Sequence, residues 1–195
     1  MKIDRKGIQQ AKAALRQEVC ARLKQMSSAD RLAGSARARA LLLQQPEWRN
    51  AQSILFFAPL PEEVDLWPLV EEALAAGKTV ALPRFEAAHG HYSACQVRNL
   101  ARDLKPGQFG IREPVNTCPQ LVLNLLDFIL VPGVAFDLQG RRVGRGRGFY
   151  DRLLGVLRGV TCGVAFDEQI VEAIPVEPHD AVVTYILTPT RWVRA

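Results

Sequence analysis

The order of predicted strands and helices between residues 53 and 82 constrains the fold more than any other feature of this chain. Residues 53–57 and 79–82 are short apolar runs rich in β-formers, and such runs predict buried strands. Residues 66–74 between them carry apolar side chains at helical spacing, and Gly77 follows as a stop signal. A strand, a helix and a second strand in this order pair the two strands in parallel through a right-handed crossover. We therefore expect an α/β protein.

Further apolar runs extend this predicted sheet. Residues 128–131 and 160–164 predict two more buried strands, so the sheet is expected to be mostly parallel and flanked by helices. Residues 87–126 are less regular, and with a strand expected at 92–97 they predict an antiparallel annex. The last strand is expected at residues 182–187.

Two amphipathic helices are expected before the sheet. Over residues 5–26, apolar side chains recur every three or four positions, at Ile8, Ala11, Leu15, Val19, Leu23 and Met26. N-cap chemistry for a second helix comes from Ser27, Ser28 and Asp30. The apolar stripe of that helix is expected at Leu32, Ala36, Ala40 and Leu43, and Pro46 ends it.

The charge and the cysteine content of the chain indicate which kinds of ligand it can bind. The net charge of +5, from 25 Lys and Arg against 20 Asp and Glu, suits an anionic ligand such as a nucleotide. The four cysteines include no C-x-x-C pair, which argues against a zinc knuckle or a redox dithiol.

Residues 1–12 lack the apolar region of a signal peptide and no apolar run could cross a bilayer, so we expect a cytoplasmic protein without membrane contact. No repeat or linker divides residues 1–195, which are expected to form one domain.

A loop rich in glycine and arginine follows a predicted strand and precedes a helix predicted at residues 149–157. Glycine stands at every second position, at Gly144, Gly146 and Gly148. This pattern allows backbone torsions and close approaches that side chains would forbid. Arg145 and Arg147 lie between the glycines and can reach phosphate oxygens.

The place of this loop in the expected fold indicates an anion site. Open α/β sheets bind ligands beyond the carboxyl ends of their strands, and helix N-termini favour anions. The loop has neither the Walker spacing nor the dinucleotide fingerprint G-x-G-x-x-G, so a phosphate-binding loop of another kind is predicted. The alternatives are a solvated basic turn and an RGG-like contact with RNA.

The residues around this loop carry a family resemblance. Residues 131–137 (VPGVAFD), Gly140 with Arg141, and residues 144–152 (GRGRGFYDR) resemble the signature of the 5-formyltetrahydrofolate cyclo-ligase family. Supporting segments occur in the expected order at residues 12–16, 59–65, 109–114, 165–169 and 174–180. The similarity therefore spans nearly the whole chain.

The resemblance implies a fold, a reaction and ligands. The fold is a single domain with a mostly parallel sheet of the NagB/RpiA/CoA-transferase-like type and two N-terminal helices. The reaction is the ATP-dependent cyclisation of 5-formyltetrahydrofolate to 5,10-methenyltetrahydrofolate with release of ADP and phosphate, through phosphorylation of the formyl oxygen. ATP is then a co-substrate, Mg²⁺ is the implied metal ion, and the folate carries a polyglutamate tail or none. A monomer is expected.

The same resemblance assigns roles to residues of this chain. It implies nucleotide binding by Lys12, Arg16, Arg142, Val143, Gly144, Arg145, Gly146, Arg147, Gly148, Phe149 and Tyr150. It implies substrate binding by Phe57, Glu63, Arg145, Gly146, Arg147, Gly148 and Phe149. The implied catalytic residues are Arg145, Arg147 and Tyr150. The implied magnesium ligands are Asp151 and Asp180, because Mg²⁺ is usually held by one or two carboxylates with phosphate oxygens and water.

Several of these residues have a second interpretation from sequence alone. Lys12 and Arg16 could be solvated charges on a helix face, and Glu63 could be an exposed loop acid. Asp151 could cap its helix. Tyr150 could stack on a flat ring or simply pack against the protein.

Three positions add detail to the pattern. Arg147 stands where Lys or Gly is commoner in the family, which keeps the loop cationic but changes its hydrogen-bond geometry. Thr184 stands where an acid is usual. His89 and His91 form an H-x-H pair, which could contribute to a metal site if a third ligand lay nearby.

Two other functions are compatible with the sequence. A homologue could keep the nucleotide loop and act on another substrate, for example in thiamine metabolism, because a fold does not determine a function. The presence of Phe57, Glu63 and Tyr150 favours folate over that alternative. Residues 141–152 could instead form a basic RNA-binding face, which would bind RNA in a salt-sensitive manner.

Overall fold

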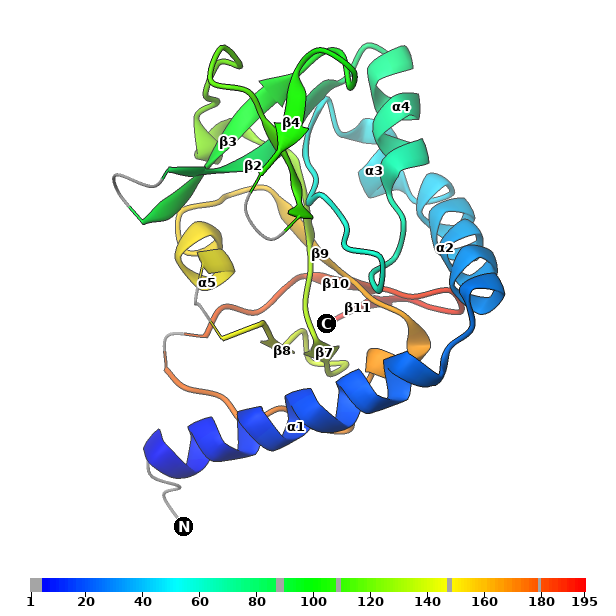
Figure 1. Ribbon diagram of the computed structural model, residues 1–195, viewed down its shortest axis with the longest axis vertical. Coiled ribbons are helices and arrows are strands. Elements are labelled where there is room, and N and C mark those ends of the chain that lie inside the picture. The colour runs from blue at the N-terminus through cyan, green and yellow to red at the C-terminus, as the bar shows by residue number, and fades with distance from the viewer. Residues whose placement is uncertain (1–4, 87–89, 108–109, 147–148, 179) are drawn as a thin grey trace.

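A seven-stranded sheet runs through the protein in the order β11-β10-β9-β6-β1-β2-β3 (Figure 1). The computed structural model describes residues 5–86, 90–107, 110–146, 149–178 and 180–195, without the side chains of Phe149 and Asp151. The strands are β1 (Ser53–Leu55), β2 (Thr79–Glu86), β3 (His91–Val97), β6 (Phe128–Val131), β9 (Val160–Val164), β10 (Tyr185–Leu187) and β11 (Trp192–Arg194). The five strands from β10 to β2 are parallel, and β3 and β11 add antiparallel edges. The predicted mostly parallel sheet is confirmed.

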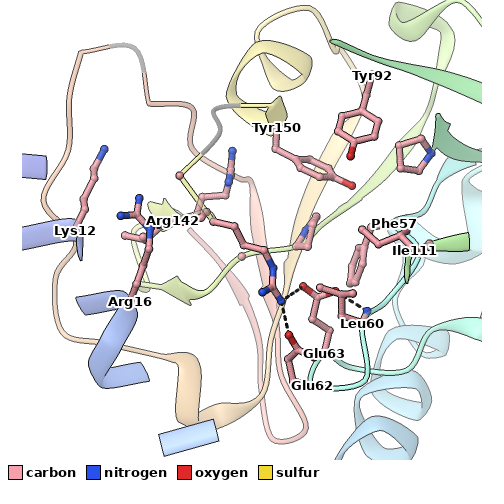
Figure 2. Close-up of a pocket in the computed structure, with 18 of the residues that line it drawn as sticks. Lys12, Arg16, Phe57, Leu60, Glu62, Glu63, Tyr92, Ile111, Arg142 and Tyr150 are labelled. Carbon is pink, nitrogen blue, oxygen red and sulfur yellow. Dashed lines mark hydrogen bonds and ion pairs between the residues drawn. The ribbon is translucent and has the colours of Figure 1, made fainter. Parts of the chain in front are cut away.

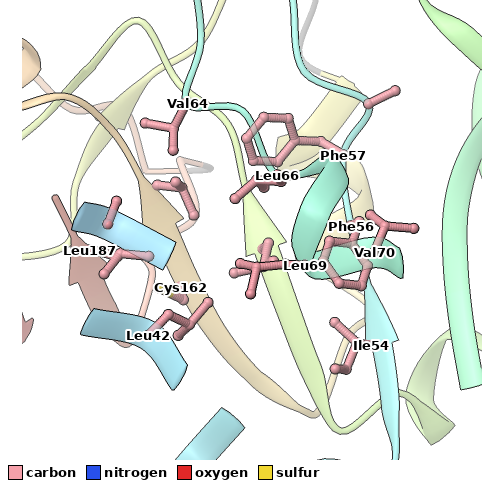
Figure 3. Packing of buried hydrophobic residues seen from close by; sticks show 14 of the residues in the cluster. Leu42, Ile54, Phe56, Phe57, Val64, Leu66, Leu69, Val70, Cys162 and Leu187 are labelled. Carbon is pink, nitrogen blue, oxygen red and sulfur yellow. The ribbon is translucent and has the colours of Figure 1, made fainter. Parts of the chain in front are cut away.

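The crossover that the sequence predicts joins β1 to β2 through α4 (Trp67–Ala75). Successive side chains of a strand point to opposite faces of the sheet. Ile54 therefore packs in one buried cluster with α1 to α4, whereas Leu55 packs in a second cluster with the helix α5 (Phe149–Leu154). Figure 3 shows the first cluster, with Ile54, Phe56 and Leu69 packed together above the sheet. Helical segments thus cover both faces.

Two small two-stranded sheets lie outside the main sheet. The pair β4 (Leu104–Pro106) and β5 (Arg112–Pro114) is antiparallel, as predicted for the annex, whereas the strand expected at residues 92–97 is β3 and pairs with β2 in the main sheet. The pair β7 (Ala135–Phe136) and β8 (Arg142–Val143) forms a hairpin after β6 and carries the chain into the loop rich in glycine and arginine. Short 3₁₀ turns lie before β6, at η2 (Leu123–Leu125), and after β9, at η3 (Asp167–Gln169).

The C-terminal strand prediction is wrong in its extent. β10 begins at Tyr185 because Val183 is held elsewhere, with its N–H donating to the Gly140 carbonyl at 2.8 Å. Val182 is 60% exposed and belongs to no strand. β10 is also not the last strand, since β11 follows and pairs with it. The helix expected at residues 149–157 ends earlier, at Leu154.

Three helices open the chain: α1 (Arg5–Gln25), α2 (Ser28–Leu43) and the short α3 (Pro46–Asn50). In Figure 1, α1 lies along one end of the molecule beside β7. Ser27 caps α2 in a capping box with Asp30, as the cap chemistry of the sequence predicts. No helix in the described part of the chain is long and apolar enough to cross a membrane.

The buried face of α2 differs from the predicted stripe. Leu32 is 67% exposed, and the buried residues are Gly34, Ser35, Ala38 and Leu42. Small residues face inward because the helix approaches its neighbours closely, and a Cβ on Gly34 would lie 3.1 Å from the Phe166 ring. The Ser35 hydroxyl also accepts a hydrogen bond from the Asp65 N–H at 3.0 Å. Close packing has therefore overridden the apolar periodicity.

The turn that leads into the annex depends on Asp103. Its carboxylate accepts hydrogen bonds from the N–H groups of Arg98 and Asn99 at 2.8 and 2.9 Å, and from Arg102 Nε at 2.8 Å. The Arg102 side chain, together with these backbone donors, lowers the pKa of Asp103 to about 2. This stabilisation is therefore present above the ordinary pKa of 3.8 and is lost as the pH falls toward 2.

We expect Asp103→Asn to lower the free energy of unfolding at pH 7 by about 1 kcal/mol, because Arg102 is largely exposed and its interaction is screened. The difference from the wild type should shrink steadily as urea unfolding is repeated at lower pH. A difference that stays constant down to the most acidic pH would contradict the role of the carboxylate charge.

Candidate active site

A cavity of about 550 Å³ opens beyond the carboxyl ends of β1 and β6. Phe57 and Ala58 follow β1, and Pro132 and Gly133 follow β6, and all four line the cavity. β1 and β6 are neighbours in the sheet, and the chain leaves them in opposite directions: from β1 to β2 toward one edge, and from β6 to β9 toward the other. This is a topological switch point, where open α/β sheets bind ligands.

The lining of the cavity divides into two regions, and Figure 2 shows Lys12 and Arg16 of the first on the opposite side from Phe57 and Ile111 of the second. The cationic region comes from α1 and from β8 with its following loop, and contains Lys12, Arg16, Arg142 and Arg145. The apolar and aromatic region contains Phe57, Leu60, Tyr92, Ile111 and Tyr150. Acidic side chains line the cavity as well, namely Glu62, Glu63, Glu113, Glu177 and Asp180. The arrangement suits a ligand with an anionic end and a flat apolar end.

Lys12 and Arg16 lie one turn apart on the face of α1 that meets the cavity. Lys12 is only 4% exposed, so it is not a solvated surface charge. Its Nζ is 2.5 Å from Asp180 Oδ2 and 3.5 Å from Glu177 Oε2. Arg16 Nε donates to the Gly144 carbonyl at 2.7 Å, which connects α1 to the loop rich in glycine and arginine.

Gly146 allows the loop to turn beside Arg16. Its φ of +95° belongs to the region that favours glycine, and a Cβ there would lie 3.7 Å from the Arg16 guanidinium. Gly144 is partly exposed and Gly146 is exposed, so the backbone of the loop is accessible at the cationic region. Arg147 and Gly148 lie outside the described residues.

Arg145 crosses the cavity to two acidic residues. Its Nη2 is 2.9 Å from Glu62 Oε1 and 3.1 Å from Glu63 Oε1 (Figure 2). Glu63 Oε2 accepts a hydrogen bond from the Leu60 N–H at 3.0 Å. The Glu63 side chain is 12% exposed, so the alternative of an exposed loop acid is wrong. Burial raises the pKa of Glu63, although the Leu60 N–H and Arg145 act in the opposite direction.

Tyr150 brings α5 to the cavity. Its ring packs against both buried clusters and also lines the cavity, near Tyr92 (Figure 2). The Arg142 guanidinium lies 5.9 Å from the centre of the Tyr150 ring. Burial raises the pKa of the Tyr150 hydroxyl far above its ordinary value, so this hydroxyl stays protonated at neutral pH.

Of the described arginines in residues 141–152, Arg142 and Arg145 line the cavity, whereas Arg141 and Arg152 do not. Arg142 is 6% exposed, and Arg145 is bound to two acids. Both side chains face the cavity. This geometry favours a small anionic ligand over RNA.

The predicted magnesium ligands are only partly described. Asp180 lines the cavity and binds Lys12, whereas the side chain of Asp151 lies outside the described residues. His89 also lies outside them, and His91 is exposed at the start of β3. Among the described residues, no group of three His, Cys, Asp or Glu side chains is placed to hold a metal ion.

All of the predicted site residues that the structure describes in full line this one cavity, namely Lys12, Arg16, Phe57, Glu63, Arg142, Val143, Gly144, Arg145, Gly146, Tyr150 and Asp180. Sequence reasoning missed Gln9, Glu62, Tyr92, Ile111, Glu113 and Glu177. Glu113 and Glu177 lie within segments that resemble the family, and this resemblance was a signal in the sequence that could have pointed to them. Gln9 lies three residues before Lys12 and so shares its helix face.

Comparison with known proteins adds an independent finding. Residues 8–189 match the model of the 5-formyltetrahydrofolate cyclo-ligase family. The 5-formyltetrahydrofolate cyclo-ligase of Mus musculus is 29% identical over 92% of this chain and 94% of its own length. That of Mycolicibacterium smegmatis is 33% identical over 75% of this chain and 78% of its own length. The solved structure of Aquifex aeolicus 5,10-methenyltetrahydrofolate synthetase has a TM-score of 0.84 and 36% identity, covering 94% of this chain and 92% of that one.

Proposed function

The chain belongs to the 5-formyltetrahydrofolate cyclo-ligase family, and on that premise we propose that it uses ATP to convert 5-formyltetrahydrofolate into 5,10-methenyltetrahydrofolate. The observation that carries the proposal is the single cavity with a cationic and an aromatic region, lined by the residues that match the family. Formation of the methenyl product with and without ATP tests it.

The cationic region receives the triphosphate. Lys12, Arg16 and Arg142 lie together beside the exposed backbone of the loop at residues 144–146 and can share the phosphate charge. Arg145 reaches from this region toward the other end of the cavity. It is therefore the residue best placed to contact the γ-phosphoryl group where it meets the folate.

The aromatic region receives the pterin. Phe57 and Tyr150 offer apolar surface for a flat ring. Glu63 offers a carboxylate that can accept hydrogen bonds from the N–H groups of the pterin, and its burial strengthens such bonds. The position of the formyl group then falls between Glu63 and the cationic loop.

The proposed reaction needs no covalent bond to the enzyme. The formyl oxygen attacks the γ-phosphorus of ATP and ADP leaves, which converts a poor leaving oxygen into a phosphate ester. N10 of the folate then attacks the formyl carbon and gives up its proton to solvent, phosphate departs, and the five-membered ring closes. The enzyme contributes mainly by holding the reacting groups together and by stabilising the transferring charge with Arg145 and its neighbours.

Magnesium would be held at the border of the cationic region. Asp180 lines the cavity, and Asp151 follows Tyr150 in sequence, so these two carboxylates are the proposed ligands. They fit the donor set of Mg²⁺, which takes few carboxylates and completes its shell with phosphate oxygens and water. When bound, the ion would neutralise phosphate charge. Lys12 shares the Asp180 carboxylate in this structure.

Residues 1–195 act as one cyclo-ligase domain and as a monomer in the cytoplasm. The substrate is 5-formyltetrahydrofolate with or without a polyglutamate tail. The excess of basic residues over acidic ones supports binding of such an anionic tail.

We expect Glu63→Gln to raise the KM for 5-formyltetrahydrofolate by about 30-fold, because the amide replaces one acceptor with a donor that faces the pterin N–H groups. The KM for ATP should change much less. The measurement is steady-state turnover with each substrate varied in turn.

Glu62→Gln is the matched control, since it makes the same change one residue away on a side chain that is 40% exposed. It should raise the KM for the folate by no more than about threefold. Because burial raises the pKa of Glu63, the wild-type KM for the folate should also rise as pH falls, starting above the ordinary pKa of 4.5. Equal effects of the two variants would remove Glu63 from the pterin site.

A further inference from the structure

Glu177 is a buried acid at the edge of the cavity to which the reaction above gives no role. It lies in the segment between η3 and β10, and its side chain is 3% exposed. Burial of a carboxylate is unfavourable unless it is paired and hydrogen-bonded. Its described partners lie on α1, more than 160 residues earlier in the chain.

The partners of Glu177 occupy one face of the first turns of α1. Glu177 Oε1 is 3.1 Å from Arg5 Nε, and Glu177 Oε2 is 3.5 Å from Lys12 Nζ. The Gln9 side-chain amide donates to the same Oε2. The three residues are spaced by four and three positions, which places them on the same side of the helix.

Glu177 also forms a hydrogen bond with Asp180, the second acidic partner of Lys12. Its backbone N–H donates at 2.7 Å to Asp180 Oδ2, the oxygen that lies 2.5 Å from Lys12 Nζ. The ammonium group of Lys12 is therefore held between the side chain of Glu177 and a carboxylate that the backbone of Glu177 orients.

Such restraint matters for a lysine more than for an arginine. Lysine carries a point charge on a flexible four-carbon stem, and fixing it in one rotamer costs conformational entropy. The pairing with Glu177 and Asp180 removes much of that freedom before a ligand arrives. A pre-oriented Lys12, one turn from Arg16, can then bind an anion without a further ordering cost.

We infer that Glu177 is a positioning residue that orients Lys12 for the phosphate groups of the nucleotide. This inference rests on the proposed function of the cationic region. For the change in ATP affinity when the charge of Glu177 is removed, this role predicts the opposite sign from simple electrostatics. Removing a negative charge near a phosphate site should strengthen anion binding if charge alone matters, and should weaken it if the orientation of Lys12 matters.

The test is Glu177→Gln, which keeps the shape of the side chain and removes its charge. ATP affinity is measured by equilibrium binding to the full-length protein without folate, and the KM for each substrate is measured separately. We expect ATP binding and the KM for ATP to weaken about tenfold, while the KM for the folate stays within twofold. Glu18→Gln, the same change on a side chain of α1 that is 68% exposed, is the matched control and should leave ATP binding unchanged.

Two further variants keep the test informative if Glu177→Gln folds poorly. Gln9→Ala removes the exposed amide that steadies Glu177 Oε2 and should weaken ATP binding two- to threefold. Glu177→Asp keeps the charge and should restore part of the affinity lost in Glu177→Gln. Unchanged or tighter ATP binding by a folded Glu177→Gln, or by Gln9→Ala, would overturn the inference. Wild-type protein that binds ATP but forms no methenyl product would instead contradict the proposed reaction and leave the role of Glu177 intact.

Discussion

Replacing Arg145 with alanine should lower turnover by about a thousandfold, the scale expected when a group that stabilises charge in the transition state is removed. Arg145 is the side chain that joins the two regions of the cavity, through Glu62 and Glu63 at 2.9 and 3.1 Å. Its loss removes the cation nearest to the proposed site of phosphoryl transfer. It also leaves the buried Glu63 carboxylate without this partner. The measurement is product formation at saturating concentrations of both substrates.

Arg152→Ala is the control for Arg145→Ala. Arg152 lies on α5, is exposed, and does not line the cavity. Its loss removes the same charge from a nearby position and should change turnover by less than about twofold. The unfolding temperature of both variants should stay within a few degrees of the wild type. Turnover by a folded Arg145→Ala within tenfold of the wild type would contradict the assigned role.

Gly140→Ala should destabilise the protein by at least about 3 kcal/mol, which lowers the unfolding temperature by roughly 10 °C for a chain of this length. Gly140 has a φ of +77°, and a Cβ would lie 2.2 Å from the Val183 carbonyl oxygen. The Gly140 carbonyl accepts the Val183 N–H at 2.8 Å, so the two backbones cannot move apart without losing this bond. The turn that leads from β7 to β8 would therefore be displaced.

Gly77→Ala separates backbone strain from steric clash. Gly77 has a nearly identical φ of +75°, but nothing lies within 4 Å of the position of its Cβ. This variant should lose only about 1 kcal/mol, from the left-handed conformation itself. Thermal unfolding of both variants gives the comparison. Similar losses in the two variants would show that the contact with Val183 does not limit the turn.

Most strands of the main sheet could be predicted, because they are short apolar runs and such runs are stable only when they are buried on both faces of a sheet. The crossover from β1 to β2 follows from the same pattern, and it places Phe57 at the cavity. The buried face of α2 could not be predicted, because Gly34 and Ser35 face inward for close packing and carry no apolar signal. β11 was missed because it is short, only partly buried and at one edge of the sheet.

The candidate site divides in the same way. The loop at residues 144–146 was predictable because its glycines and arginines are adjacent in sequence. Lys12 was assigned by family resemblance, whereas its burial opposite Glu177 depends on a partner 165 residues away. Apart from its place in a segment that resembles the family, nothing local marks Glu177, since a glutamate between two prolines is usually an exposed loop residue. Long-range pairs of charges of this kind become visible only once the chain is folded.

The most direct test of the central claim is to incubate the purified protein with 5-formyltetrahydrofolate, magnesium and ATP at mildly acidic pH, where the methenyl product persists. The near-ultraviolet absorbance of the product is followed with and without ATP. We expect an increase that requires ATP and is accompanied by an equal amount of ADP. No increase from a folded protein that binds ATP would contradict the account and would indicate a different substrate for the same nucleotide site.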